Sequence, residues 1–187
     1  MKKQLLVILI LCSNLIFGQE SKHDVHISGF GGPFFQVSSL NNKASFNVGG
    51  GGGMIINSQF CFGGFGEGLA IVQNQGSENF KDHEFSVGHG GLWIGYVFNI
   101  NEQNGIFIHT QLGWGSALLI KNADISFINE YTVVKPAIEY ERKLISFLKL
   151  GIGVAYPLYN GIANPLYKDS DFTKLNGFIS LKFGWFE

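Results

Sequence analysis

The sequence predicts an all-β protein, an eight-stranded antiparallel up-and-down transmembrane β-barrel. Three observations point to it: an N-terminal export signal, long segments with alternating apolar and polar residues, and connections that alternate between short and longer. A tilted transmembrane strand takes about 9–11 residues. In outer-membrane barrels, residues facing the lipid alternate with residues facing the lumen, and the short turns lie on the periplasmic side.

The first eighteen residues have the features of a cleaved secretory signal. Lys2 and Lys3 precede an apolar run that is far too short for a membrane-spanning helix, which needs about 20 residues, and Gly18 is a small residue before the expected cleavage site. A lipoprotein signal at Cys12 is an alternative, but Leu11 stands where that processing needs a small side chain. We therefore expect a signal peptide at 1–18 and one barrel domain at 19–187. Its single cysteine, Cys61, excludes an internal disulfide.

The rest of the chain alternates between apolar-periodic segments and turn-forming residues. The predicted strands span 24–38, 44–56, 59–71, 84–99, 105–119, 128–142, 146–159 and 172–186. The links near 57–58, 101–104 and 143–145 are short, and those near 40–43, 73–83, 122–126 and 160–171 are mostly longer and polar. An even number of strands places both ends of the barrel domain on the periplasmic side.

The parity of each strand predicts which residues face the lumen. In the last segment, the odd positions are almost all apolar, whereas the even positions include Asn176, Ser180 and Lys182. A soluble ligand-binding barrel, the main alternative, would turn its bulky apolar set inward. Here the inward set would carry the charges, which favours lipid outside. Phe65, Val87 and Trp93 are exceptions, because they fall on the lumen side.

Outward aromatic residues gather at two heights on the predicted barrel. Amphipathic rings prefer the level of the lipid headgroups, so we expect two girdles. The one at the short-turn ends comprises Tyr96, Phe98, Tyr140 and Trp185, and the one towards the long-loop ends comprises Phe46, Trp114 and Tyr156.

The lumen should be filled by side chains, because an eight-stranded barrel is only just wide enough to hold them. We expect a structural charge network of Lys135, Glu139, Glu141, Lys149 and Lys182. A tight turn centred on Leu144 would place Glu139 opposite Lys149, and either neighbouring register that keeps both charges inside would leave them diagonal. The glycine-rich stretches give room for inward aromatics such as Phe34 and Trp93.

Several motifs together resemble a known family. The stretches SGFGGPFFQVSS (28–39), NVGGGGGMII (47–56), FCFGGFGEG (60–68), HGGLWIGYVF (89–98) and QLGWG (111–115), with the terminal LKFGWF, resemble small outer-membrane β-barrel proteins of Bacteroidetes. The likeness covers nearly the whole mature chain. It implies a barrel in the outer membrane and carries no catalytic residues, since members are largely of unknown function. Glu187 departs from the terminal aromatic that barrel-assembly signals commonly end on.

Possible chemistry along the chain is sparse. His26 and Ser28 share one strand face, as in outer-membrane lipid A deacylases, but parity places them in the lumen near the periplasmic rim, whereas such an enzyme needs them facing lipid. His89 and His109 fall in the lumen set, and a metal site needs three or four converging ligands. We expect no catalytic, cofactor-binding or metal site, and Cys61 as a buried apolar residue.

Three classes of function remain open. The leading one is a non-enzymatic outer-membrane barrel with a structural role or one mediated by its loops. The others are an enzyme acting on lipid or lipopolysaccharide and a small transport element. The expected partners are outer-membrane lipids and the barrel-assembly machinery, with an unknown partner outside the cell. Nucleic acid is not expected, since acidic residues outnumber basic ones and nucleic-acid binding would call for a clustered basic surface.

Overall fold

The structure is a computed structural model that describes residues 25–40, 43–70, 83–121, 124–163 and 167–186. The strands are β1 (Ile27–Leu40), β2 (Lys43–Ile56), β3 (Phe60–Leu69), β4 (His83–Asn99), β5 (Asn104–Lys121), β6 (Asp124–Ile145), β7 (Leu148–Ala155), β8 (Leu158–Asn160) and β9 (Asn176–Gly184). One short helix, α2 (Asp169–Phe172), lies between β8 and β9. No helix in these ranges is long and apolar enough to span a membrane. The expected signal peptide at 1–18 lies outside the described residues.

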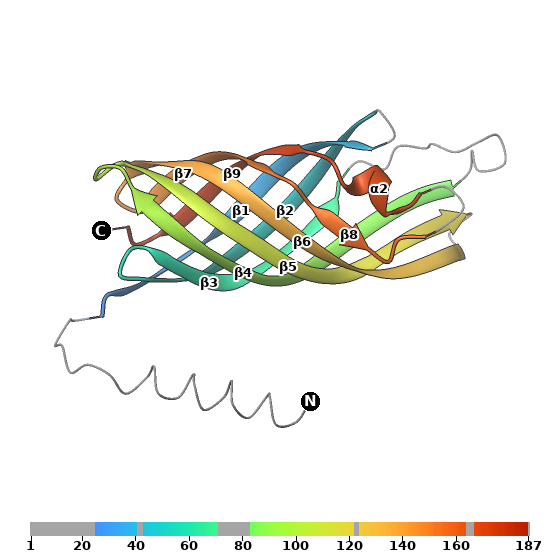
Figure 1. The fold of residues 1–187 in the computed structure, drawn as a ribbon, viewed down its shortest axis with the longest axis horizontal. Coiled ribbons are helices and arrows are strands. Elements are labelled where there is room, and N and C mark those ends of the chain that lie inside the picture. Colours follow the sequence, from blue (N-terminus) through green and yellow to red (C-terminus); the bar gives the residue numbers. More distant parts are fainter. Residues whose placement is uncertain (1–24, 41–42, 71–82, 122–123, 164–166, 187) are drawn as a thin grey trace, which may run out of the picture.

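The strands form a closed antiparallel ring (Figure 1). Each strand from β1 to β6 pairs with the next, and β9 pairs with both β1 and β7, which closes the barrel. β7 and β8 pair with successive parts of β6, so together they form one interrupted strand of the barrel. The ring therefore has eight strands. Pro157, which lacks a backbone N–H, stands in the gap between them. The eight-stranded antiparallel barrel is therefore confirmed.

The connections divide the barrel into a turn end and a loop end. The turn end has the links 57–59, 100–103 and 146–147, and the chain enters β1 and leaves β9 there (Figure 1). At the loop end, however, β1 and β2 are separated by only two residues, 41–42, and β5 and β6 by only 122–123. The prediction of longer links at these two places was wrong, because the strands themselves continue further than expected.

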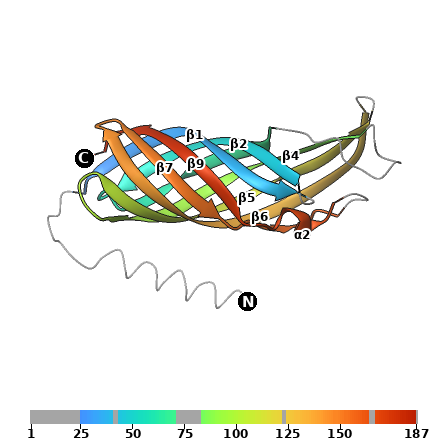
Figure 2. The same ribbon diagram turned by 90° about the horizontal axis from the view of Figure 1, so that it is seen from above.

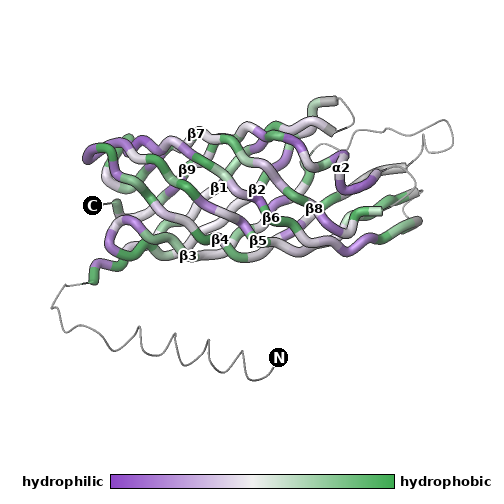
Figure 3. Tube along the Cα trace, viewed as in Figure 1, coloured by the Kyte–Doolittle hydropathy of each residue, from purple (hydrophilic) through white to green (hydrophobic). Residues whose placement is uncertain are grey.

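Alternation along the strands separates the two faces of the wall, and Figure 3 shows it as a change of hydropathy from residue to residue. In β6, every odd residue from Tyr131 to Glu141 is buried and every even one is exposed. The same parity holds in β5, where His109 and Gln111 are buried beside exposed Ile108 and Leu112. The exterior is apolar over most strands, and the polar side chains gather inside.

The three apparent exceptions to this alternation belong to the lumen. Phe65, Val87 and Trp93 are all buried. Phe65 and Trp93 pack in one inner apolar cluster together with Phe34, whereas Val87 belongs to a second cluster near the loop end. The interior is thus partly aromatic rather than uniformly polar.

At the loop end, β4, β5 and β6 extend past the rest of the wall, and Figure 2 shows the β5–β6 hairpin projecting beyond the β1–β2 hairpin. The inner face of this extension is covered by the segment after β8. Ile162 and Tyr167 from that segment are buried against Leu119, Tyr131 and other residues of the second cluster. The described parts of the link between β8 and β9 therefore fold back over the lumen.

Candidate functional site

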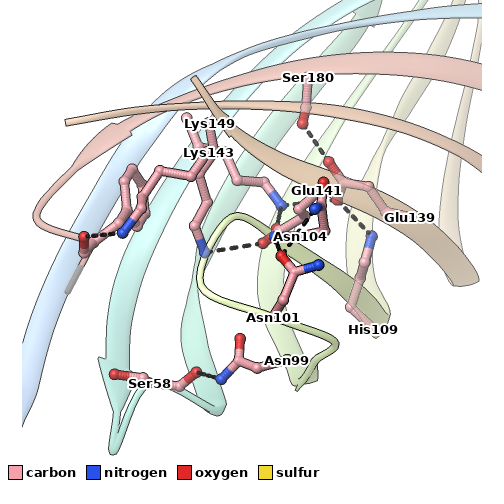
Figure 4. A network of polar contacts seen from close by, with 12 residues as sticks. Ser58, Asn99, Asn101, Asn104, His109, Glu139, Glu141, Lys143, Lys149 and Ser180 are labelled. Atoms are coloured by element: carbon pink, nitrogen blue, oxygen red, sulfur yellow. Dashed lines mark hydrogen bonds and ion pairs between the residues drawn. The ribbon is translucent and has the colours of Figure 1, made fainter. Parts of the chain in front are cut away.

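Carboxylates and ammonium groups gather inside the barrel near its turn end, in a group that we call the Glu139 cluster: His109, Glu139, Glu141, Lys149, Ser180 and Lys182 (Figure 4). The Lys182 ammonium group donates to Glu139 Oε2 at 2.8 Å and to Glu141 Oε1 at 2.5 Å. Lys149 donates to the other oxygen of Glu141 at 3.2 Å. Lys182 thus holds two carboxylates at once, and both are almost completely buried.

Aromatic rings surround the ammonium group of Lys182. Its Nζ lies 4.3 Å from the ring centroid of Phe107, 5.5 Å from that of Trp93 and 5.6 Å from that of Phe30. A cation near an aromatic face is attracted by the ring quadrupole, and the attraction is stronger where water is excluded. The aromatic lumen residues and the charges therefore form one packed unit.

A second group of polar side chains lies further towards the loop end, and we call it the Glu67 cluster: Gln36, Asn47, Glu67 and Lys135. Glu67 forms an ion pair with Lys135 and accepts hydrogen bonds from Gln36 at 3.1 Å and Asn47 at 3.0 Å. Lys135 also donates to Gln36 at 3.4 Å. Each cluster draws on strands that are far apart in the sequence.

The five charges predicted as a single network are divided between these clusters. Lys135 contacts Glu67, whereas Glu139, Glu141, Lys149 and Lys182 belong to the other group. Sequence reasoning did not include Glu67 in the network, although its parity on β3 marks it as inward. Its partner could be found only from the way β3 and β6 face each other across the lumen.

The predicted register of β6 and β7 was wrong. Glu139 lies opposite Gly153, and Lys149 lies opposite Lys143, so Glu139 and Lys149 do not face each other. β6 continues to Ile145, and a register shift between Lys143 and Ile145 precedes the turn at 146–147. The shift lies on the turn side of Lys143, so it does not affect the alternation between Glu139 and Lys143. Both charges stay in the lumen, and Lys149 pairs diagonally with Glu141.

Glycines make the space that the buried carboxylates and rings need. A Cβ atom on Gly151 would overlap Oε1 of Glu139, and one on Gly49 would overlap the ring of Phe34. A Cβ on Gly51 would lie 3.0 Å from the ring of Trp93. The expectation that glycines give room for inward aromatics therefore holds at Phe34 and Trp93.

Gly151→Ala is expected to lower the unfolding midpoint of the barrel in urea, because the new methyl group would displace Glu139 from Ser180 and Lys182. Overpacking of this kind typically costs about 1–3 kcal/mol. Gly177→Ala is the matched control, since a Cβ there would have nothing within 4 Å. Equal midpoints for the two variants would contradict the prediction, because they would mean that Glu139 can move away from the methyl group without loss of stability.

The titratable residues considered for catalysis or metal binding do not converge. His26 precedes β1 and is exposed, so the expectation that it lies in the lumen was wrong, while Ser28 lines a vestibule at the turn end. His89 Nδ1 is 3.1 Å from the hydroxyl of Tyr131, and His109 Nε2 is 3.6 Å from Glu139. Among the described residues, no group of three or more His, Cys, Asp or Glu side chains could hold a metal ion.

All seven residues expected in the aromatic girdles have outward positions. Tyr96, Phe98, Tyr140, Trp114, Tyr156 and Trp185 are exposed, and Phe46 is half-buried against Phe35. The hydroxyl of Tyr140 donates to Asn104 Oδ1 at 2.6 Å, which turns its polar tip towards the turn end. Their level relative to lipid headgroups stays a prediction.

No protein-family model and no curated protein matches the chain. Solved structures do share its fold. The chain is similar to Neisserial surface protein A (NspA), with a TM-score of 0.59 and 12% identity over 86% of this chain and 97% of that one. It is also similar to Ail, the attachment invasion locus protein of Yersinia pestis, in complex with the heparin analogue sucrose octasulfate, with a TM-score of 0.50 and 13% identity over 86% and 97%. The fold is that of the small outer-membrane barrels.

Proposed function

We propose that this protein is a non-enzymatic barrel of the outer membrane that presents a protein-binding surface on its β4–β5–β6 extension outside the cell. The observation that carries the proposal is a second apolar patch on the outer face of β5 and β6, beyond a polar band. The apolar exterior of the barrel, its similarity to outer-membrane barrels and the export signal predicted from the sequence support the location.

The polar band separates the patch from the lipid-facing wall. Going from the turn end along the paired strands, Trp114 lies opposite Thr132, and Ser116 lies opposite Glu130. These are followed by two wholly apolar outward pairs, Leu118 with Ile128 and Ile120 with Ile125. Ile125 and Ile128 are 55% and 58% exposed. Because a transmembrane strand needs only about 9–11 residues, this part of the 18-residue β5 and the 22-residue β6 would stand above the lipid.

The free edge of β6 adds a second means of binding. β8 pairs with β6 at Thr132, Val133 and Val134, and the chain after it continues beside β6 as far as Asn129, whose side-chain amide donates to the carbonyl of Ala163. No described strand pairs with that edge between 124 and 128. An unpaired edge presents backbone N–H and C=O groups to which an extended peptide can add as a further strand. An apolar patch beside such an edge fits a partner segment with alternating apolar side chains.

Site-specific photo-cross-linking on intact cells tests this proposal. A photoreactive residue in place of Ile128 should give adducts with polypeptide. The same residue in place of Ile138 should give none, since Ile138 is also an outward residue of β6 but lies ten residues closer to the turn end, within the lipid-facing wall. Unheated gels, on which a folded barrel migrates differently from the boiled protein, check that both variants are assembled. If Ile128, like Ile138, gives no adduct with polypeptide, the patch is covered by lipid and the proposal is wrong.

A further inference from the structure

Eight buried polar side-chain atoms in the described part of the chain have no hydrogen-bond partner. They are Asn47 Oδ1, His89 Nε2, Trp93 Nε1, His109 Nδ1, His109 Nε2, Gln111 Oε1, Asn129 Oδ1 and Asn176 Oδ1. Of these, His109 Nε2 faces Glu139 Oε2 at 3.6 Å, which is too long for a hydrogen bond. A buried polar atom without a partner is costly, and most such atoms in folded proteins are bound to protein or to ordered water. Their arrangement therefore indicates what else the lumen holds.

Seven of these atoms belong to residues that line two internal cavities. The outer cavity, near the loop end, has about 20 Å³ open to the centre of a water molecule and is lined by Asn47, His89 and Asn176, among others. The middle cavity has about 10 Å³ and is lined by Trp93, His109 and Gln111, among others. Trp93, His109, Gln111 and Asn176 are each at least 95% buried. Unpartnered atoms thus gather around two small spaces.

We propose that ordered water molecules occupy both cavities and serve as the missing partners. One water needs about 10–15 Å³ of such space, so the middle cavity has room for one water and the outer cavity for one or two. In the middle cavity, the indole N–H of Trp93 can only donate and Oε1 of Gln111 can only accept. An occupant that serves both must accept one hydrogen bond and donate another, which a bare cation or anion cannot do.

The charges nearby also favour a neutral occupant. Glu67 borders the outer cavity and is already paired with Lys135, so a further ion there would be uncompensated. Beside the middle cavity, Glu139 is paired with Lys182. Water satisfies the free atoms without changing this balance.

Water in the middle cavity would connect the two charge clusters. That cavity is lined by Gln36 and Lys135 from the Glu67 cluster and by Glu139 and Ser180 from the Glu139 cluster. Lys149, at the other side of the Glu139 cluster, borders an open vestibule of about 400 Å³ at the turn end. The bound water therefore completes one hydrogen-bonded polar column from the outer cavity to the vestibule.

Cross-relaxation between water and the indole protons tests the proposal on the refolded protein in detergent micelles. The Trp93 Nε1–H should show a cross-peak with long-lived water, whereas Trp114 and Trp185, which are 62% and 77% exposed on the outside of the barrel, should show contact with detergent chains. A crystal structure at high resolution should contain solvent density in both cavities. A missing Trp93 cross-peak together with empty cavities would overturn the proposal.

Gln111→Met provides the matched test, because methionine has a similar length and lacks the amide oxygen. The Trp93–water cross-peak should fall several-fold, while water in the outer cavity should remain. Leu112→Met, at the neighbouring outward residue, is the control and should change neither. An unchanged Trp93 cross-peak in a folded Gln111→Met barrel would contradict the placement of water between Trp93 and Gln111. If the variant does not fold, the measurement on the unchanged protein still tests the proposal.

Discussion

Replacement of Lys182 by methionine is expected to lower the free energy of unfolding by about 3–5 kcal/mol, which is the usual cost of breaking a buried ion pair. Lys182 donates to both Glu139 and Glu141, so its loss leaves two buried carboxylates without their shared cation. Lys149 can compensate only Glu141, since it has no contact with Glu139. This makes Lys182 the single charge on which the Glu139 cluster depends most.

Urea unfolding in lipid vesicles, followed by the mobility of unheated samples on gels, measures this effect. Lys143→Met is the matched control. Lys143 is only half-buried, and its ammonium group donates to the backbone carbonyl of Phe186 at 3.3 Å. Its replacement therefore removes this contact and does not deprive Glu139 or Glu141 of a cation. Adding Glu139→Gln to Lys182→Met should restore part of the stability, because it removes one uncompensated charge. A double variant that is less stable still would contradict this account of the cluster.

Replacement of Lys135 by methionine should have an effect of similar size, about 3–5 kcal/mol, because it leaves Glu67 charged and buried. Unlike Lys182, Lys135 serves one carboxylate, so one further substitution should compensate. In the double variant Lys135→Met/Glu67→Gln, the new amide can still accept hydrogen bonds from Gln36 and Asn47. We expect its unfolding midpoint to lie much closer to that of the unchanged protein than to that of Lys135→Met.

A double-mutant cycle gives the coupling between Lys135 and Glu67. The control is Glu130→Gln, an exposed carboxylate on the same strand as Lys135, which should change stability by no more than about 0.5 kcal/mol. If the effects at Lys135 and Glu67 are simply additive, the two side chains do not depend on each other, and the ion pair contributes nothing to the fold.

The fold could be predicted from the sequence because its determinants are local. A period of two over a long segment identifies a strand with different surroundings on its two faces, and parity then assigns residues such as Lys135 and Glu139 to the lumen without any knowledge of register. The glycines opposite inward aromatics follow from the same parity. These features lie within a few residues of each other, so a single sequence contains them.

The partners inside the lumen could not be predicted in the same way. Register depends on where each turn begins. β6 continues to Ile145, so the turn lies at 146–147 and not at Leu144, and Lys149 therefore pairs with Glu141 and not with Glu139. Glu67 and Lys135 come from strands that do not pair, so only the closed ring brings them together. The return of Ile162 and Tyr167 over the loop end was missed for the same reason.

Closure of the ring by β1 and β9 also constrains how the barrel can enter a membrane. Gln36 and Lys135 are 99 residues apart and Lys135 and Glu67 are 68 apart, so these contacts form only when distant parts of the chain have met. Insertion one strand at a time would bring Lys135 and Glu139 into contact with acyl chains before their partners arrive, at a cost of several kcal/mol for each charge. The sheet must therefore curl around its charges while it crosses the bilayer, and its slowest step should be the late meeting of the first and last strands.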